Sequence, residues 1–187
     1  MKNTSWFRVT ALASSLAFLA PLSAQLSKEM QDGLTLRTAA AAAVINGSER
    51  SADAITRLKA HASPSGLKID RDADFAFAAL DVGQRLLAAG KAADAEEFFR
   101  AAEKSLDKVL KKTPDSAAND KVQFLSALAM IRARYLNNAP QAKADLDAAI
   151  KLKPEDKQLE SLRGTLGKEH GDTFTERPAK DGKPANG

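Results

Sequence analysis

The feature that most constrains this chain is the regular interruption of alanine- and leucine-rich segments by short breaks containing glycine, proline or asparagine. From Leu26 to about Lys168 the apolar residues recur with the period of an α-helix, without the alternation typical of a strand. Breaks such as Asn46-Gly47 and Gly90 come at helix lengths. The sequence therefore predicts an all-α protein of about seven helices, expected near residues 27–46, 51–63, 72–90, 92–112, 116–137, 140–153 and 154–168.

The same residues indicate how these helices pack. Short linkers place consecutive helices antiparallel. The predicted fourth and sixth helices each carry a narrow apolar stripe, whereas the fifth is apolar over a wider arc, so we expect it to be covered on more than one side. The stripes are Ala95, Phe99, Ala102, Leu106 and Val109 in the fourth helix, Ala142, Leu146, Ala149 and Ile150 in the sixth, and Val122, Phe124, Leu125, Leu128, Ile131 and Tyr135 in the fifth.

The hairpin predicted over residues 72–112 has small and aromatic residues at regular positions. These are Gly83 and Leu86 in its first helix, Gly90 at its turn, and Ala95, Phe99 and Ala102 in its second helix. Small residues let the helices approach closely, and the aromatic ring fills the space beside them. The series recurs as Ala142, Leu146 and Ala149 before Pro154, and more weakly as Ala54, Leu58 and His61. This pattern resembles the tetratricopeptide repeat, a two-helix unit of about 34 residues.

The resemblance implies a short, right-handed array of antiparallel hairpins whose first helices line a concave groove for peptides or protein segments. The family's register would place seven residues in this groove: Phe77, Asp81, Gln84, Phe124, Leu128, Ile131 and Tyr135. The copies are irregularly spaced, and the early tryptophan of the repeat is absent. A plain helical bundle is therefore the alternative architecture.

The two ends of the chain differ from its helical part. Residues 1–24 combine a basic start at Lys2 and Arg8, an apolar run and small residues before Gln25, which is typical of a secretory signal peptide. We therefore predict export to the periplasm or beyond, with no integral membrane segment after signal removal. Residues 25–170 form the predicted helical domain. Residues 171–187 are rich in glycine, proline and charge, which predicts a disordered tail.

Few residues offer material for catalysis or metal binding. The chain has no cysteine and two histidines, and these are isolated from each other. Asp70, Asp72 and Asp74 match the start of a calcium loop, but Phe75 stands where such a loop needs glycine. We interpret the aspartates as a helix N-cap followed by an acidic first turn. The sequence predicts no metal site, cofactor or catalytic residue.

The charge balance excludes one further class of partner. The formal net charge is +4, which falls to +2 when Lys2 and Arg8 leave with the signal. This value is too small, and its charges too evenly mixed, to indicate nucleic-acid binding. The leading expectation is a non-enzymatic, exported protein-interaction module. The alternative is a small periplasmic helical bundle with a structural or ligand-binding role and no peptide groove.

Overall fold

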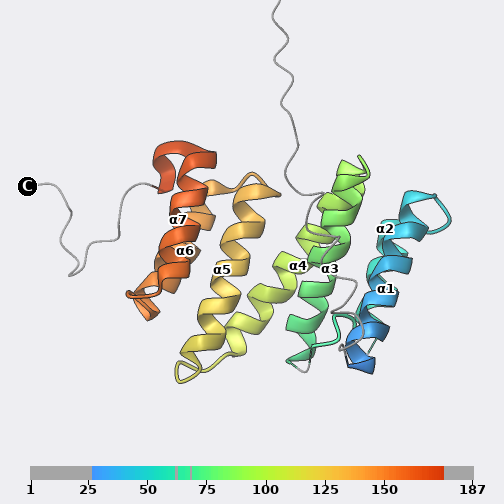
Figure 1. Cartoon of the computed structure of the whole chain (residues 1–187), viewed down its shortest axis with the longest axis horizontal. Coiled ribbons are helices and arrows are strands. Elements are labelled where there is room, and N and C mark those ends of the chain that lie inside the picture. The colour runs from blue at the N-terminus through green and yellow to red at the C-terminus, as the bar shows by residue number, and fades with distance from the viewer. Residues whose placement is uncertain (1–26, 62, 68, 175–187) are drawn as a thin grey trace, which may run out of the picture.

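A computed structural model describes residues 27–61, 63–67 and 69–174 of the chain (Figure 1). Within these residues it contains helices and no strands, which confirms the predicted fold class. The elements are α1 (Lys28–Ile45), α2 (Ser51–Ala60), α3 (Arg71–Ala88), α4 (Ala92–Lys112), α5 (Ala118–Arg134), α6 (Ala139–Leu152), α7 (Lys157–His170) and the 3-10 helix η3 (Gly171–Phe174). The predicted signal peptide lies outside the described residues.

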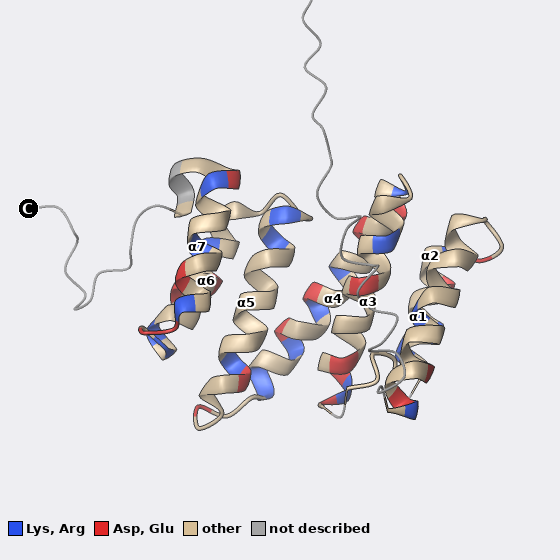
Figure 2. Ribbon diagram, viewed as in Figure 1, with Lys and Arg blue, Asp and Glu red and all other residues tan. Residues whose placement is uncertain are grey.

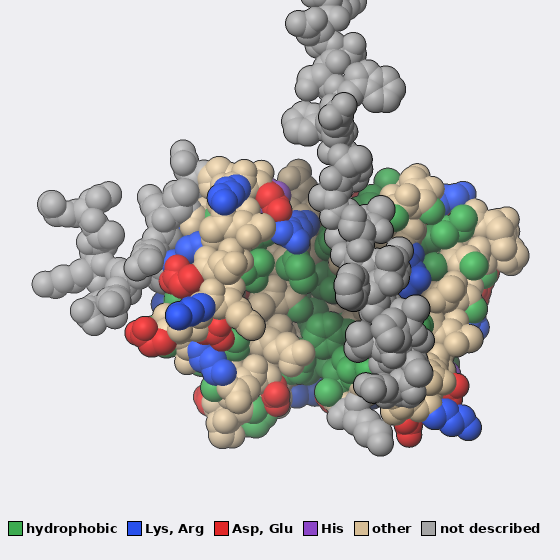
Figure 3. Space-filling view, in the orientation of Figure 1, with side chains coloured by type: hydrophobic (Ala, Val, Ile, Leu, Met, Phe, Trp, Pro, Cys, Tyr) green, Lys and Arg blue, Asp and Glu red, His purple; other side chains and the backbone are tan. Residues whose placement is uncertain are grey.

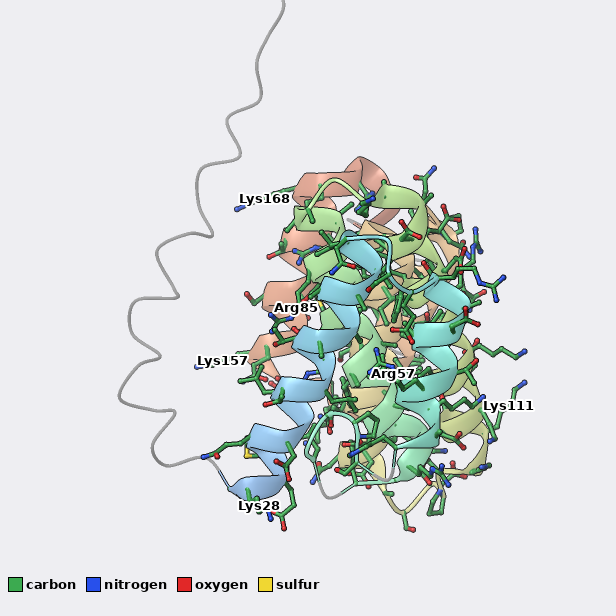
Figure 4. All side chains as sticks on the ribbon, turned by 90° about the vertical axis from the view of Figure 1, so that its right-hand side faces the viewer. Lys28, Arg57, Arg85, Lys111, Lys157 and Lys168 are labelled. Carbon is green, nitrogen blue, oxygen red and sulfur yellow. The ribbon has the colours of Figure 1, made fainter. Side chains whose placement is uncertain are left out.

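The helices form two layers. Each odd-numbered helix packs antiparallel against the even-numbered helix that follows it, and the α3–α4 and α5–α6 pairs have the most extensive contacts. In the odd layer α1 also contacts α3 and α5 contacts α7, while α2 contacts α4 in the even layer. Figure 4 views the layers edge-on, with Lys28 of α1 and Lys157 of α7 projecting on one side and Lys111 of α4 on the other.

Three hairpin turns rely on residues in the left-handed region. The φ angles are +76° at Gly47, +77° at Gly90 and +50° at Asn137. Glycine and asparagine tolerate this conformation, which lets N–H groups beyond the helix return to carbonyls in its last turn. At the α3–α4 turn, for example, the Lys91 N–H donates to the Leu86 carbonyl at 2.9 Å. The predicted breaks at these positions are confirmed.

The α3–α4 pair shows why Gly83 has no side chain. A Cβ atom added to Gly83 would lie 2.6 Å from Cε1 of Phe99, which is closer than real contacts allow. The Phe99 ring, in turn, stacks on Tyr135 with a centroid separation of 4.1 Å. The predicted stripe residues Phe99, Ala102 and Leu106 are buried, as is Leu146 in α6. The sequence therefore predicted this close helix contact correctly.

Helix α5 is covered on two sides, as its wide apolar arc predicted. Phe124, Ala127, Leu128 and Ile131 belong to an N-terminal cluster of buried residues shared with α1–α4. Val122, Leu125, Ala129 and Ala133 belong to a C-terminal cluster shared with α6, α7 and η3. Helix α5 thus contributes buried residues to both clusters, and Leu110 of α4 also packs against both.

Several predicted boundaries differ from the structure by up to three residues at helix ends, and two differences bear on the packing. We expected the seventh helix to start at Pro154, but α7 starts at Lys157, after a turn in which the Asp156 N–H donates to the Lys153 carbonyl. The Asp156 carboxylate then caps α7 by accepting from the Gln158 N–H at 2.8 Å. The ordered fold also extends past the predicted end at residue 170, because Phe174 is 1% exposed and packs into the C-terminal cluster.

Candidate functional site

The odd-numbered layer carries two open pockets, one on each side of α5. The first, of about 410 Å³, lies between the start of α3, the end of α4 and the start of α5. The second, of about 540 Å³, lies between α5 and α7. Gln123 lines both, so they form one surface that we call the α5 surface. Figure 3 shows hydrophobic side chains gathered in the middle of this face.

The first pocket lies beside α3 and α5, which are not extensively packed on each other. Near their C-terminal ends the Gln84 side-chain amide donates to the Tyr135 hydroxyl at 3.0 Å. Helix α5 packs extensively on α4, whereas α3 and α5 have no comparable contact. The space between them contains Ile69 before α3 and Phe124 of α5. Ile69 is 43% exposed and contributes apolar surface to this pocket.

The structure divides the seven predicted groove residues into two groups. Phe77, Asp81 and Tyr135 are half-buried, and Gln84 is exposed, so these four remain at the surface. Leu128 and Ile131 are 0% exposed and Phe124 is 7% exposed. Those three side chains belong to the N-terminal cluster. Asp81 is also occupied, since Arg37 donates to its carboxylate at 2.8 Å and Arg85 at 3.2 Å.

Of the predicted α5 residues, Phe124 lines the first pocket, but Leu128 and Ile131 line neither pocket. The pocket residues of this helix include Gln123, Ala127 and Met130, which repeat at helical spacing one position before Phe124, Leu128 and Ile131. One residue corresponds to about 100° of rotation on a helix, since each turn takes 3.6 residues. Sequence reasoning missed Met130 and Leu162 as well, although Met130 shares its helical face with the polar Gln123.

A buried ion-pair cluster joins α4, α5 and α6 behind this surface. The Arg132 guanidinium, 8% exposed, donates to Glu103, Asp107 and Asp145, each at 2.7 Å. Burial lowers the pKa of Arg132, but the hydrogen bonds to Glu103 and Asp145 outweigh it, so the pKa is raised overall. Burial raises the pKa of Asp145 above its ordinary value, and the hydrogen bond from Arg132 offsets this only in part. The cluster fixes three helices relative to one another.

The Arg132 cluster also escaped sequence reasoning, although α5 carries a signal for it. Arg132 follows Leu125 and Ala129 on one helical face, and both of these are buried. A charged residue on a buried face needs partners, because an unpaired buried charge is strongly unfavourable. The sequence alone does not show which carboxylates meet it.

The three aspartates at the start of α3 have separate partners. The Asp70 carboxylate accepts from the N–H groups of Asp72 and Ala73, which confirms the predicted N-cap. The hydrogen bond from Lys108 lowers the pKa of Asp72, and Lys112 adds to this effect. Asp74 is 1% exposed and accepts from Ser65 and from the Leu67 N–H. Among the described residues no group of three or more His, Asp or Glu side chains could hold a metal ion.

Adding millimolar calcium is therefore expected to leave the thermal unfolding midpoint unchanged. Binding would require Asp70 and Asp72 to exchange a helix cap and lysine contacts for the ion. A thermal denaturation series with calcium, and with magnesium as the matched control, measures this directly. A rise in the midpoint specific to calcium would show that the aspartates bind the ion, because a ligand stabilises the state that binds it.

Charges are mixed over the described helices. Figure 2 shows Lys and Arg interspersed with Asp and Glu, and many are paired locally, such as Arg100 with Glu96 at 2.6 Å. No described helix is both long enough and apolar enough to cross a bilayer. No protein-family model matches the chain, and neither a curated protein nor a solved structure matches it significantly.

Proposed function

We propose that this chain is an exported, non-enzymatic interaction module that holds a segment of another protein on the α5 surface. The observation that carries this proposal is the partly apolar surface on both sides of α5, where Ile69 is exposed and Met130 is half-buried within the part of the chain that the structure describes. Surfaces of this kind are typical of protein-interaction sites. The aromatic and aliphatic side chains there favour a partner segment with apolar anchors.

A tetratricopeptide-like arrangement supports the same proposal. The described part of the chain consists of three consecutive hairpins followed by α7, with the first two hairpins in contact through α1 and α3 and the third in contact with α7 through α5. The contact between Gly83 and Phe99 is the packing that this repeat uses within a hairpin. In such arrays the first helices of the hairpins form the binding face. Export rests on the signal-like residues 1–24, which lie outside the described residues.

A small helical bundle with a structural or ligand-binding role is the second candidate function. The burial of Leu128 and Ile131 favours it, since these residues serve the core rather than a groove. The weak packing between α3 and α5 also departs from a regular array. The two proposals differ in whether the α5 surface binds a partner.

A pair of matched variants tests this difference. We expect Met130→Glu to abolish capture of a partner in a crosslinking pull-down with residues 25–187 from an envelope extract, because it places a charge on the α5 surface. Leu152→Glu makes a similar change at an exposed residue of α6, in the other layer, and should capture the partner like the unmodified chain.

The interpretation requires that both variants stay folded, which circular dichroism and the unfolding midpoint establish. Partners enriched equally by the unmodified chain and by both variants would contradict a site on the α5 surface. Absence of any partner enriched over a surface-scrambled control would favour the bundle.

A further inference from the structure

Helix α1 lies at one end of the described array, and its outer side carries an exposed stripe. Figure 4 looks onto this end, with α1 and α2 nearest the viewer. The buried residues Gly33, Ala40 and Val44 mark the side of α1 that packs inward. On another side, residues three or four positions apart are all exposed, and they follow one line along the helix. These residues, which we call the α1 stripe, are Lys28, Gln31, Leu34, Thr38, Ala42 and Ile45.

The α1 stripe is uncharged beyond its first residue. Residues 33–48 include one charged side chain, Arg37, and it pairs with Asp81 of α3. Leu34 is 39% exposed and Ile45 is 38% exposed. A surface helix ordinarily carries polar and charged residues on its solvent side. An exposed face with large apolar residues and no charge is instead typical of a surface that another protein covers.

The stripe is complementary to itself in the antiparallel direction. From Gln31 to Ile45 its residues are spaced by three, four, four and three positions, so the pattern is the same when it is read from either end. A two-fold axis at Thr38 therefore places Leu34 of each copy opposite Ala42 of the other. A large side chain then meets a small one on both sides of the axis, as close helix packing requires. The Thr38 side chains of the two copies meet on the axis itself.

The charges at the ends of α1 favour the same direction. The last turn of α1 contains no basic residue, so the helix itself provides no cation beside its C-terminal carbonyl groups. Lys28 lies at the other end of the stripe. In an antiparallel pair, Lys28 of one copy lies beside the C-terminal end of α1 in the other, where a cation is favourable. A parallel pair would instead bring the two Lys28 side chains together.

We propose that the α1 stripe binds the α1 stripe of a second copy of this chain, giving a two-fold dimer with antiparallel α1 helices. The paired segment from Lys28 to Ile45 is about 26 Å long, so it buries less area than a standard interface of about 1,600 Å². The dimer is accordingly weak and forms as the protein concentration rises. The proposal is independent of the α5 surface, because no residue of the α1 stripe lines its pockets.

Sedimentation equilibrium of residues 25–187, from micromolar to millimolar concentration, measures this association. We expect a reversible dimer for the unmodified chain. Leu34→Glu should raise the dissociation constant by about 10-fold or more, because it places a carboxylate in the contact on each side of the axis. Leu152→Glu makes the same change at an exposed leucine of α6 and should leave the dissociation constant unchanged. Circular dichroism and the unfolding midpoint establish that both variants stay folded.

Introduced cysteines test the direction of the two helices, since the chain has no cysteine of its own. Under mild oxidation Thr38→Cys should form a disulfide-linked dimer, because the two thiols meet on the axis within disulfide range. Leu34→Cys alone should crosslink slowly, whereas an equimolar mixture of Leu34→Cys and Ala42→Cys should crosslink readily. Leu152→Cys measures the crosslinking that random collision produces.

A chain that stays monomeric over the whole concentration range would overturn the proposal and leave the α1 stripe to a different protein. An association that Leu34→Glu does not weaken, or that Leu152→Glu weakens equally, would overturn it as well, because the contact would then lie outside α1. Crosslinking of Leu34→Cys alone as fast as that of Thr38→Cys would contradict the antiparallel direction. None of these results decides whether the α5 surface binds a partner, which Met130→Glu tests separately.

Discussion

Replacing Arg132 by leucine is expected to destabilise the fold by about 3–5 kcal/mol, the cost of removing one partner from a buried ion pair. The substitution leaves the Asp145 carboxylate, 7% exposed, without its cation. Glu103 and Asp107 then lie near Asp145 with no positive charge between them. Natural domains have a total stability of about 5–15 kcal/mol, so this single change removes a large part of it.

The loss of folding free energy in Arg132→Leu should depend on pH in a defined direction. The folded-state pKa of Asp145 is already raised by burial, and removing Arg132 raises it further. A folded state with a raised carboxyl pKa binds a proton more tightly than the unfolded state does, so its stability falls as the pH rises through that pKa. The difference in unfolding free energy between the unmodified chain and Arg132→Leu should therefore be largest at neutral pH. It should become smaller as the pH falls toward the ordinary pKa of an aspartate.

Urea unfolding at neutral and mildly acidic pH measures the loss of unfolding free energy and how far it decreases at the lower pH. Arg100→Leu is the matched control, because Arg100 makes an exposed ion pair with Glu96 and its loss should cost less than about 1 kcal/mol. Asp145→Asn in the leucine background should restore part of the stability. The same deficit at both pH values, or no rescue by asparagine, would show that buried charge is not the cause.

Leu128→Ala is expected to cost about 2–5 kcal/mol, because it removes a fully buried side chain and leaves a cavity in the N-terminal cluster. Gln123→Ala on the same helix is the control. Gln123 is exposed, and its truncation should change the free energy of unfolding by less than about 0.5 kcal/mol.

The urea midpoint should shift for Leu128→Ala with an unchanged slope. If a substitution at Leu128 also weakens partner binding, the cause would then be unfolding of the domain and not the loss of a direct contact with the partner. Stability equal to that of the unmodified chain would instead place the Leu128 side chain outside the core.

Local signals predicted most of the helices. Helix α4 begins and ends where the sequence indicated, because Gly90 stops the preceding helix and Pro114 follows the last turn. The prediction for α7 was wrong because a proline suits both a first helical turn and the turn before a helix. Phe174 was assigned to the tail because a single apolar residue gives no periodic pattern. Its burial depends on the geometry at the end of α7, where it packs beside Gly167.

The candidate site was less predictable than the helices. The family register placed the groove on α3 and α5, which stays a prediction, but it did not anticipate the rotation of α5, which is set by its packing on α4 and α6. That rotation buries Leu128 and exposes Gln123. A shift of one residue in the predicted register therefore assigns core residues to the surface. The pockets themselves lie between elements distant in the sequence, the start of α3 with the α4–α5 turn and α5 with α7, and no local pattern encodes such a juxtaposition.

The position of α5 in both clusters has a consequence for how the protein loses its structure. If α6 and α7 separated from the rest, Val122 and Leu125 would face water while Leu128 stayed packed, and Arg132 would lose Asp145. Partial opening at this junction is therefore costly, unlike fraying at the outer hairpin. The chain should melt as one cooperative unit, in contrast to long repeat arrays that open module by module.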